Sequence, residues 1–158
     1  MKNIRLSKGA NSMPESYPHN TDIEQSVLTS IMFNLPRRQE CLTRLKEKHF
    51  YSDRHKTIYR AINRICDQTG EPGDLARLAD ELKKSGELEN VGATYLSYLM
   101  DHIPMGENFG YYIDTLENLA LKRGLFDFAN IAFKAAIDDH TAAIDDIGKL
   151  TQTLIDSS

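Results

Sequence analysis

The stretch from Asn108 to Asp139 constrains the fold of this chain more than any other. It contains no proline and only two glycines, and its apolar residues recur every three or four positions, the spacing of one face of an α-helix. At about 1.5 Å per residue such a helix is roughly 45 Å long, more than a compact domain of 158 residues usually holds. The stretch therefore predicts one long helix that dominates the architecture.

This helix carries two apolar stripes on nearly opposite faces, because nine residues at roughly 100° each separate Tyr112 from Leu121. The first stripe, with Arg123 and Asn130 in two of its positions, consists of Tyr112, Leu116, Leu119, Phe126, Phe133 and Ile137. The second consists of Leu121, Leu125, Phe128, Ala132 and Ala135. A helix with two apolar faces has to bury both. It is either a central helix surrounded by its own domain or a projecting helix whose first stripe is an oligomer interface.

The segments before the long helix predict a helical head. Capping and breaking residues separate five short apolar-periodic segments, near residues 20–33, 37–46, 53–70, 74–85 and 92–103. No segment of useful length alternates with a period of two, so we expect no strands. The predicted head core consists of Val27, Leu28, Ile31, Phe50, Ile58, Tyr59, Ile62, Leu78, Leu82, Leu96 and Leu99.

The predicted fold class is all-α, with a head followed by a long antiparallel helical hairpin. Residues 1–17 are polar and lack a period, so we expect a flexible arm there, followed by the head at 18–106 and the hairpin at 107–158. The second hairpin helix can be capped by Thr141, after a short turn at Asp139 and His140. Its apolar face is Ile144, Ile147, Thr151, Leu154 and Ile155.

Composition excludes several classes of protein. The net charge is −4 and the pI about 5.7, which disfavours tight duplex DNA binding over the whole surface. No apolar run reaches the length of a membrane span, and the first residues lack an export signal. Cys41 and Cys66 form no CxxC pair, so we expect buried thiols in a reducing compartment, and a cytoplasmic protein.

Motifs for catalysis are missing from the sequence. There is no GxxxxGK[ST] or GxGxxG phosphate loop and no HExxH, and no serine sits in a strand-to-helix elbow. The histidines are scattered, at His19, His49, His55, His102 and His140. For His55, a satisfied histidine at the edge of the core is favoured over a metal ligand, because the apolar Ile58 and Tyr59 follow one turn later. We therefore expect no enzyme activity, cofactor or metal in this chain.

Four segments resemble the N-terminal domain of bacterial replicative DNA helicases of the DnaB type. They read PHNTDIEQSVLTSIM, HFYSDRHKTIYRAI, GEPGDLARLADELKKSGELENVGATYLSYL and IPMGENFGYYIDTLENLALKR, and the resemblance extends from about Pro18 to Asp156. Thr29 replaces a glycine that is usual in the family, and Gly73 stands where a β-branched residue is common. The chain ends at Ser158, where the family continues into a RecA-like ATPase domain, so a fragment and a stand-alone protein both remain open.

The resemblance implies the function of a helicase collar. In the family, hairpins pair between subunits to build a ring hexamer, and the collar docks primase and touches single-stranded DNA. A helicase loader is a further implied partner, whereas ATP and magnesium belong to the ATPase domain. For primase the candidate surfaces are 134–146, near the hairpin turn, and exposed parts of the head.

Two alternatives remain from the sequence. The helicase-binding C-terminal domain of a primase is similar in architecture to this head and hairpin, although the order of the motifs favours the helicase. A helical DNA-binding regulator would need a basic recognition helix. The segment after Asp53 has a basic side, which is more typical of a solvated helix face, at Arg54, Lys56, Arg60 and Arg64.

Overall fold

The computed structural model describes residues 17–33, 35–101 and 109–137, together with residues 148, 149, 151, 152 and 155. Every regular element among these residues is helical, so the predicted all-α class is confirmed. The elements are α1 (Thr21–Phe33), α2 (Leu35–Arg44), the 3-10 helix η1 (Glu47–His49), α3 (Asp53–Thr69), α4 (Leu75–Lys84), α5 (Leu88–Val91), α6 (Ala93–Asp101) and α7 (Phe109–Ile137). Residues 1–16 of the predicted arm, and most of the predicted second hairpin helix, lie outside the described residues.

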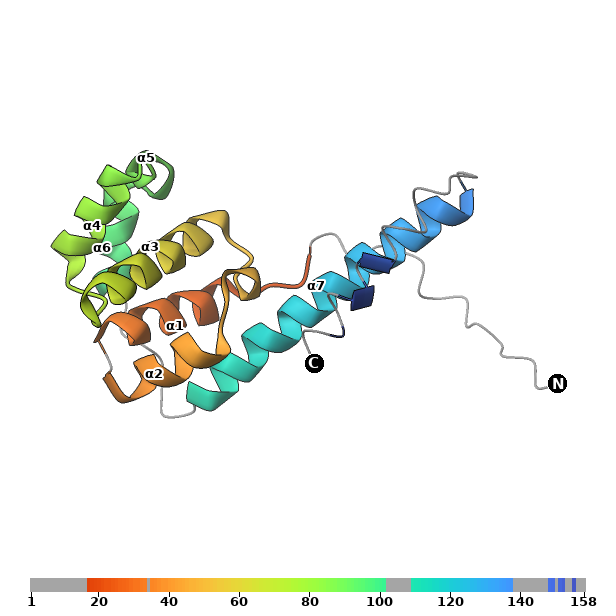
Figure 1. Cartoon of the computed structure of the whole chain (residues 1–158), viewed down its shortest axis with the longest axis horizontal. Helices are drawn as coiled ribbons and strands as arrows, with labels where there is room; N and C mark the ends of the chain where they lie inside the picture. Colours follow the sequence, from red (N-terminus) through yellow and green to blue (C-terminus); the bar gives the residue numbers. More distant parts are fainter. Residues whose placement is uncertain are drawn as a thin grey trace.

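Helix α1 is the centre of the head. All its residues from Glu24 to Met32 are buried, because α2, α3, α6 and α7 contact it from different sides (Figure 1). A helix surrounded in this way has to be apolar on most of its surface or to pair its polar groups internally. α1 relies mainly on the second: Glu24, Gln25 and Thr29 are hydrogen-bonded, whereas the buried Ser30 hydroxyl has no partner among the described residues. These buried polar residues matter for the candidate site below.

The helix ends follow from local sequence. The Asn20 side chain accepts a hydrogen bond from the Ile23 amide at 3.0 Å, and the Asp74 carboxylate accepts one from the Arg77 amide at 2.9 Å. Both are N-caps that satisfy amides with no partner inside the helix. Gly70 ends α3 with a φ of 78°, in the left-handed region that favours glycine. Ser52 occupies the predicted N-cap position of α3, but its side chain makes no capping hydrogen bond.

Two helix boundaries differ from the sequence-based expectation. α2 begins at Leu35 rather than Arg37, so that Pro36 lies in its first turn, where the fixed φ of proline suits the helix. Leu88–Val91, between the fourth and fifth predicted segments, forms the additional short helix α5. Gly92 then separates α5 from α6 with a φ of 83°.

The structure accommodates both residues that depart from the family pattern, Thr29 and Gly73. The buried Thr29 hydroxyl donates to the Gln25 and Ser26 carbonyls at 2.9 and 3.1 Å, so the extra polar group is satisfied within α1. Gly73 has a φ of 74°, and a Cβ at this position would lie 2.6 Å from the Arg77 side chain. A β-branched residue would be strained there.

The head has one continuous core that includes the start of α7. Every residue of the predicted head core is buried there, at 3% exposure or less. Phe109, Ile113 and Leu116 of α7 belong to the same core. The first two turns of the long helix are therefore packed into the head, and the rest of α7 extends away from it (Figure 1).

Candidate assembly surface and the contacts that hold it

The outer half of α7 exposes large apolar side chains. Ile113 and Leu116 are fully buried in the head, whereas Leu121 is 42%, Leu125 50% and Phe133 66% exposed. Scattered apolar residues are normal on a protein surface, but several on one projecting helix form a surface suited to a partner. We call the outer half of α7, from residue 121 onward, the exposed segment.

The structure divides the predicted oligomer interface. Placing Leu116 in a partner interface was wrong, because its side chain is fully buried against the head of its own chain. Tyr112 is half-buried and packs against the same core. Leu119 and Phe126 are half-buried, Phe133 is exposed, and the side chain of Ile137 lies outside the described residues. Periodicity identified an apolar stripe correctly, but the head covers the beginning of that stripe.

Residues 17–20, which lead into α1, cross the middle of α7 as a strap. The Tyr17 hydroxyl donates a hydrogen bond to the Asp127 carboxylate at 2.8 Å, and its ring centroid lies 6.3 Å from that of Phe126. This hydrogen bond to a carboxylate raises the pKa of Tyr17. Phe126 is thus contacted by its own chain. Tyr17 was predicted as the last residue of a flexible arm, and here it contacts α7.

Arg123 connects α7 to both the strap and η1. Its guanidinium donates to the Pro18 carbonyl at 2.9 Å and to the Lys48 and His49 carbonyls at 3.0 Å each. It also lies 5.9 Å from the centroid of the Tyr51 ring. Burial lowers the pKa of Arg123. A polar residue within an apolar stripe is therefore explained by three backbone acceptors that the sequence could not reveal.

A second arginine connects α2 to the beginning of α7. Arg44 lies 2.6 Å from the Asp114 carboxylate and 2.5 Å from that of Glu117, and these hydrogen bonds raise the pKa of Arg44. All three side chains are about one-third exposed or more, so each pair contributes on the order of 1 kcal/mol or less.

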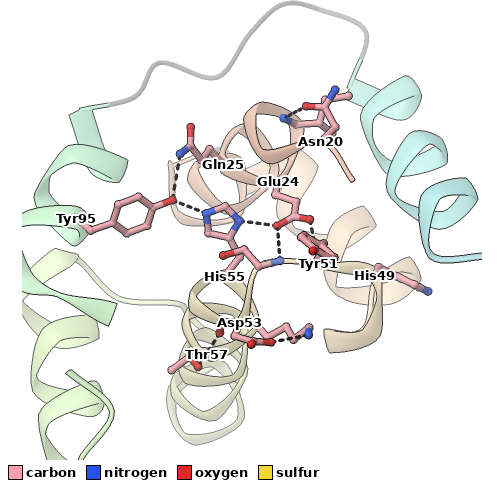
Figure 2. Close-up of polar contacts among 12 residues, drawn as sticks. Asn20, Glu24, Gln25, His49, Tyr51, Asp53, His55, Thr57 and Tyr95 are labelled. Atoms are coloured by element: carbon pink, nitrogen blue, oxygen red, sulfur yellow. Dashed lines mark hydrogen bonds and ion pairs between the residues drawn. The ribbon is translucent and has the colours of Figure 1, made fainter. Parts of the chain in front are cut away.

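A buried polar network holds the backbone of Tyr51 and Ser52, which connects η1 to α3 (Figure 2). The Glu24 carboxylate, 1% exposed, accepts hydrogen bonds from the Tyr51 amide at 2.7 Å and the Ser52 amide at 3.3 Å. It also lies 2.6 Å from Nδ1 of His55. Glu24 lies in the first turn of α1, where the helix dipole favours an acid, and it also accepts from the backbone of the segment that enters α3.

His55 is satisfied on both ring nitrogens. Since a carboxylate can only accept, Nδ1 donates to Glu24, and Nε2 contacts the Tyr95 hydroxyl. That hydroxyl also accepts from the Gln25 amide at 3.0 Å (Figure 2). Burial raises the pKa of Tyr95, and the Arg54 guanidinium lies 4.3 Å from the centre of its ring. The interpretation of His55 as a satisfied core histidine is confirmed. Neither ring nitrogen is left for a metal or a substrate.

The basic side of α3 is compensated by acids. Arg60 pairs with Glu47 at 2.9 Å and with Glu87 at 2.8 Å. Arg64 pairs with Glu81 at 2.7 Å and with the same Glu87 at 2.8 Å. A recognition helix needs basic side chains directed at phosphate. These two are directed at carboxylates of the head, which argues against the DNA-binding regulator.

Among the described residues, no group of three or more histidine, cysteine, aspartate or glutamate side chains is placed to hold a metal ion. In the same part of the chain, no helix is both long enough and apolar enough to cross a membrane.

The fold and the exposed segment define a class: a helical interaction module, in which a head carries a projecting helix. A family model described as the DnaB-like helicase N terminal domain matches residues 16–118, and the chain belongs to this family. This assignment favours the helicase over the primase alternative.

Individual relatives agree. The chain is 27% identical to the replicative DNA helicase DnaB of Buchnera aphidicola subsp. Baizongia pistaciae, over 98% of this chain and 32% of that protein. It is 34% identical to that of Mycobacterium leprae, over 70% of this chain and 18% of that protein. The chain thus spans a third or less of these relatives.

A solved structure has the same fold. The crystal structure of the N-terminal domain of DnaB helicase from Mycobacterium tuberculosis matches with a TM-score of 0.72 and 28% sequence identity. The match covers 87% of this chain and 99% of that one. The head and projecting helix are therefore the fold of a DnaB N-terminal domain.

Proposed function

We propose that this chain acts as the collar of a replicative helicase and assembles through the exposed segment of α7, so that hairpins of neighbouring subunits pair on the way to a hexamer. The observation that carries the proposal is the exposure of Leu121, Leu125 and Phe133 on a helix that projects from the head. Fully burying one such side chain is worth about 1.5–3 kcal/mol. Burying the exposed parts of several such side chains together contributes to a contact between subunits.

Primase docking and contact with single-stranded DNA are part of the same proposal. The candidate primase surface is the segment 134–146, of which residues 134–137, at the end of α7, belong to the described part of the chain. A helicase loader is a further proposed partner. ATP and magnesium are assigned to an ATPase domain, because this sequence contains no phosphate loop.

The exposed segment is tested by charge substitution. Leu125→Asp combined with Phe133→Asp places two charges in the proposed contact, and we expect light scattering to show a fall in mass to that of one chain. Tyr111→Asp is the matched control, since Tyr111 is 63% exposed on the same helix but lies next to the head. The control is expected to keep the mass of the unmodified chain. An unchanged mass in the double variant would exclude assembly through this surface.

A further inference from the structure

Beyond the two turns that are packed into the head, α7 is connected to the rest of the chain by Arg123, which donates to three backbone carbonyls. Two of the three acceptors, those of Lys48 and His49, belong to η1, and the third, that of Pro18, belongs to the strap. The three acceptors are 74 residues or more away from Arg123 in the sequence. These contacts therefore require η1 and the strap to stay in place.

The start of η1 is held in part by a side chain that can take up a proton. Beside the backbone hydrogen bonds from the His49 amide to the Lys46 carbonyl and from the Phe50 amide to the Glu47 carbonyl, Nδ1 of His49 accepts a hydrogen bond from the Lys46 amide at 3.1 Å. A ring nitrogen can accept only when it carries no proton. A proton on Nδ1 would turn this acceptor into a donor that faces another donor. The His49 ring is 9% exposed, so water cannot easily replace the lost bond.

We propose that Arg123, the strap and η1 form a clamp that fixes the direction in which α7 leaves the head, and that protonation of His49 opens this clamp. The clamp lies within one chain, so the proposal does not depend on how chains assemble. When His49 carries a proton, the start of η1 loses the side-chain acceptor of the Lys46 amide. The carbonyls of Lys48 and His49 then no longer converge on the guanidinium.

The charges around His49 favour the closed state at neutral pH. Lys46 and Lys48 on either side of η1, and Arg123 from α7, disfavour a proton on the ring, while Glu117 from α7 opposes them. Burial of the ring lowers the pKa of His49 more than any of these charges does, and the pKa falls to about 4. A freely exposed histidine titrates near 6.5, so at about pH 5 protonation shifts the equilibrium between closed and open clamp on the order of 30-fold toward open.

A distance measurement between the head and α7 tests this clamp in the full chain. Nitroxide labels are attached to Asn90→Cys in the head and Lys134→Cys on α7, in a Cys66→Ser background. Cys41 can stay, because burial raises the pKa of its thiol to about 12 and keeps it unreactive. An excess of unlabelled chain ensures that each measured distance lies within one molecule. Double electron–electron resonance is recorded near pH 7.5 and near pH 5.

The expected results separate the two parts of the proposal. The unmodified clamp gives one narrow distance near pH 7.5 and a broad distribution near pH 5. We expect Arg123→Gln to give a broad distance distribution at both pH values. Arg123→Lys keeps the charge but not the planar fork of donors, and we expect its distance distribution at neutral pH to be broader than that of the unmodified chain. His49→Asn stays narrow at both, because its side-chain oxygen accepts from the Lys46 amide without titrating.

Asp67→Asn is the control for removing a titratable side chain outside the clamp. Asp67 is exposed on α3, and we expect this variant to behave like the unmodified chain. A narrow distribution in Arg123→Gln near pH 7.5, with helix content retained by circular dichroism, would overturn the clamp. Equal broadening of His49→Asn and the unmodified chain near pH 5 would overturn the role of His49.

Discussion

The head and the exposed segment of α7 have similar apolar periodicity but differ in what covers them. In the head, residues such as Leu28, Ile62 and Leu99 are fully buried, whereas Leu121, Leu125 and Phe133 on α7 are 42–66% exposed. A periodic sequence shows that a helix has an apolar face. It does not show whether the cover comes from the same chain, from the strap or from another subunit.

The two regions also use polar groups differently. The head buries Glu24 and His55 in one satisfied network, so that a carboxylate and an imidazole stabilise its interior. α7 is attached by arginines that reach outward to carbonyls and carboxylates, as Arg123 and Arg44 do. Breaking a contact of the Glu24–His55 network leaves unsatisfied polar groups in the core. Breaking an arginine contact of α7 leaves polar groups that water can reach.

The largest expected effect comes from the buried network. Glu24→Ala leaves two backbone amides and His55 without their acceptor, and we expect a loss of about 3–5 kcal/mol in the free energy of unfolding, measured with urea. Asp22→Asn is the matched control, since Asp22 is exposed in the same helical turn; its expected loss is at most about 1 kcal/mol. Equal losses in the two variants would mean that Glu24 contributes only through the helix dipole.

A smaller effect distinguishes two leucines on the same helix. Leu116→Ala removes a fully buried side chain and is expected to cost about 2–5 kcal/mol in urea unfolding. Leu125→Ala, at a half-exposed position, is expected to cost less than about 1 kcal/mol at low protein concentration, where chains do not associate. If the two substitutions cost the same, α7 would have to be covered along its whole length within one chain.

Most of the head could be predicted from the sequence, because its determinants are local. Asp74 caps the residues next to it, Gly70 ends the helix before it, and the periodic positions of Ile58, Tyr59 and Ile62 identify a buried face. Each of these signals lies within a few residues of the feature that it predicts.

The features that the sequence did not predict depend on contacts between residues that are far apart in the chain. Glu24 and His55 are 31 residues apart, and Arg123 reaches Pro18 across 105 residues. The burial of Leu116 likewise depends on how α7 sits against the head. An acid within a buried helix was the available signal for the Glu24 network. An arginine within an apolar stripe was the corresponding signal for Arg123.

The last prediction concerns the junction between the two regions, where His49 couples stability to pH. The folded chain keeps the pKa of His49 near 4, below the value of about 6.5 in an unfolded chain, so the unfolded state binds the extra proton first. This contribution to stability is complete above about pH 6.5 and is lost as the pH falls toward 4, by at most about 3 kcal/mol. Urea unfolding of the unmodified chain should therefore weaken over this range more steeply than that of His49→Asn. All other side chains are the same in the two proteins, so the difference between the two curves isolates the histidine. Parallel curves would exclude His49 as the source of the pH dependence of the junction.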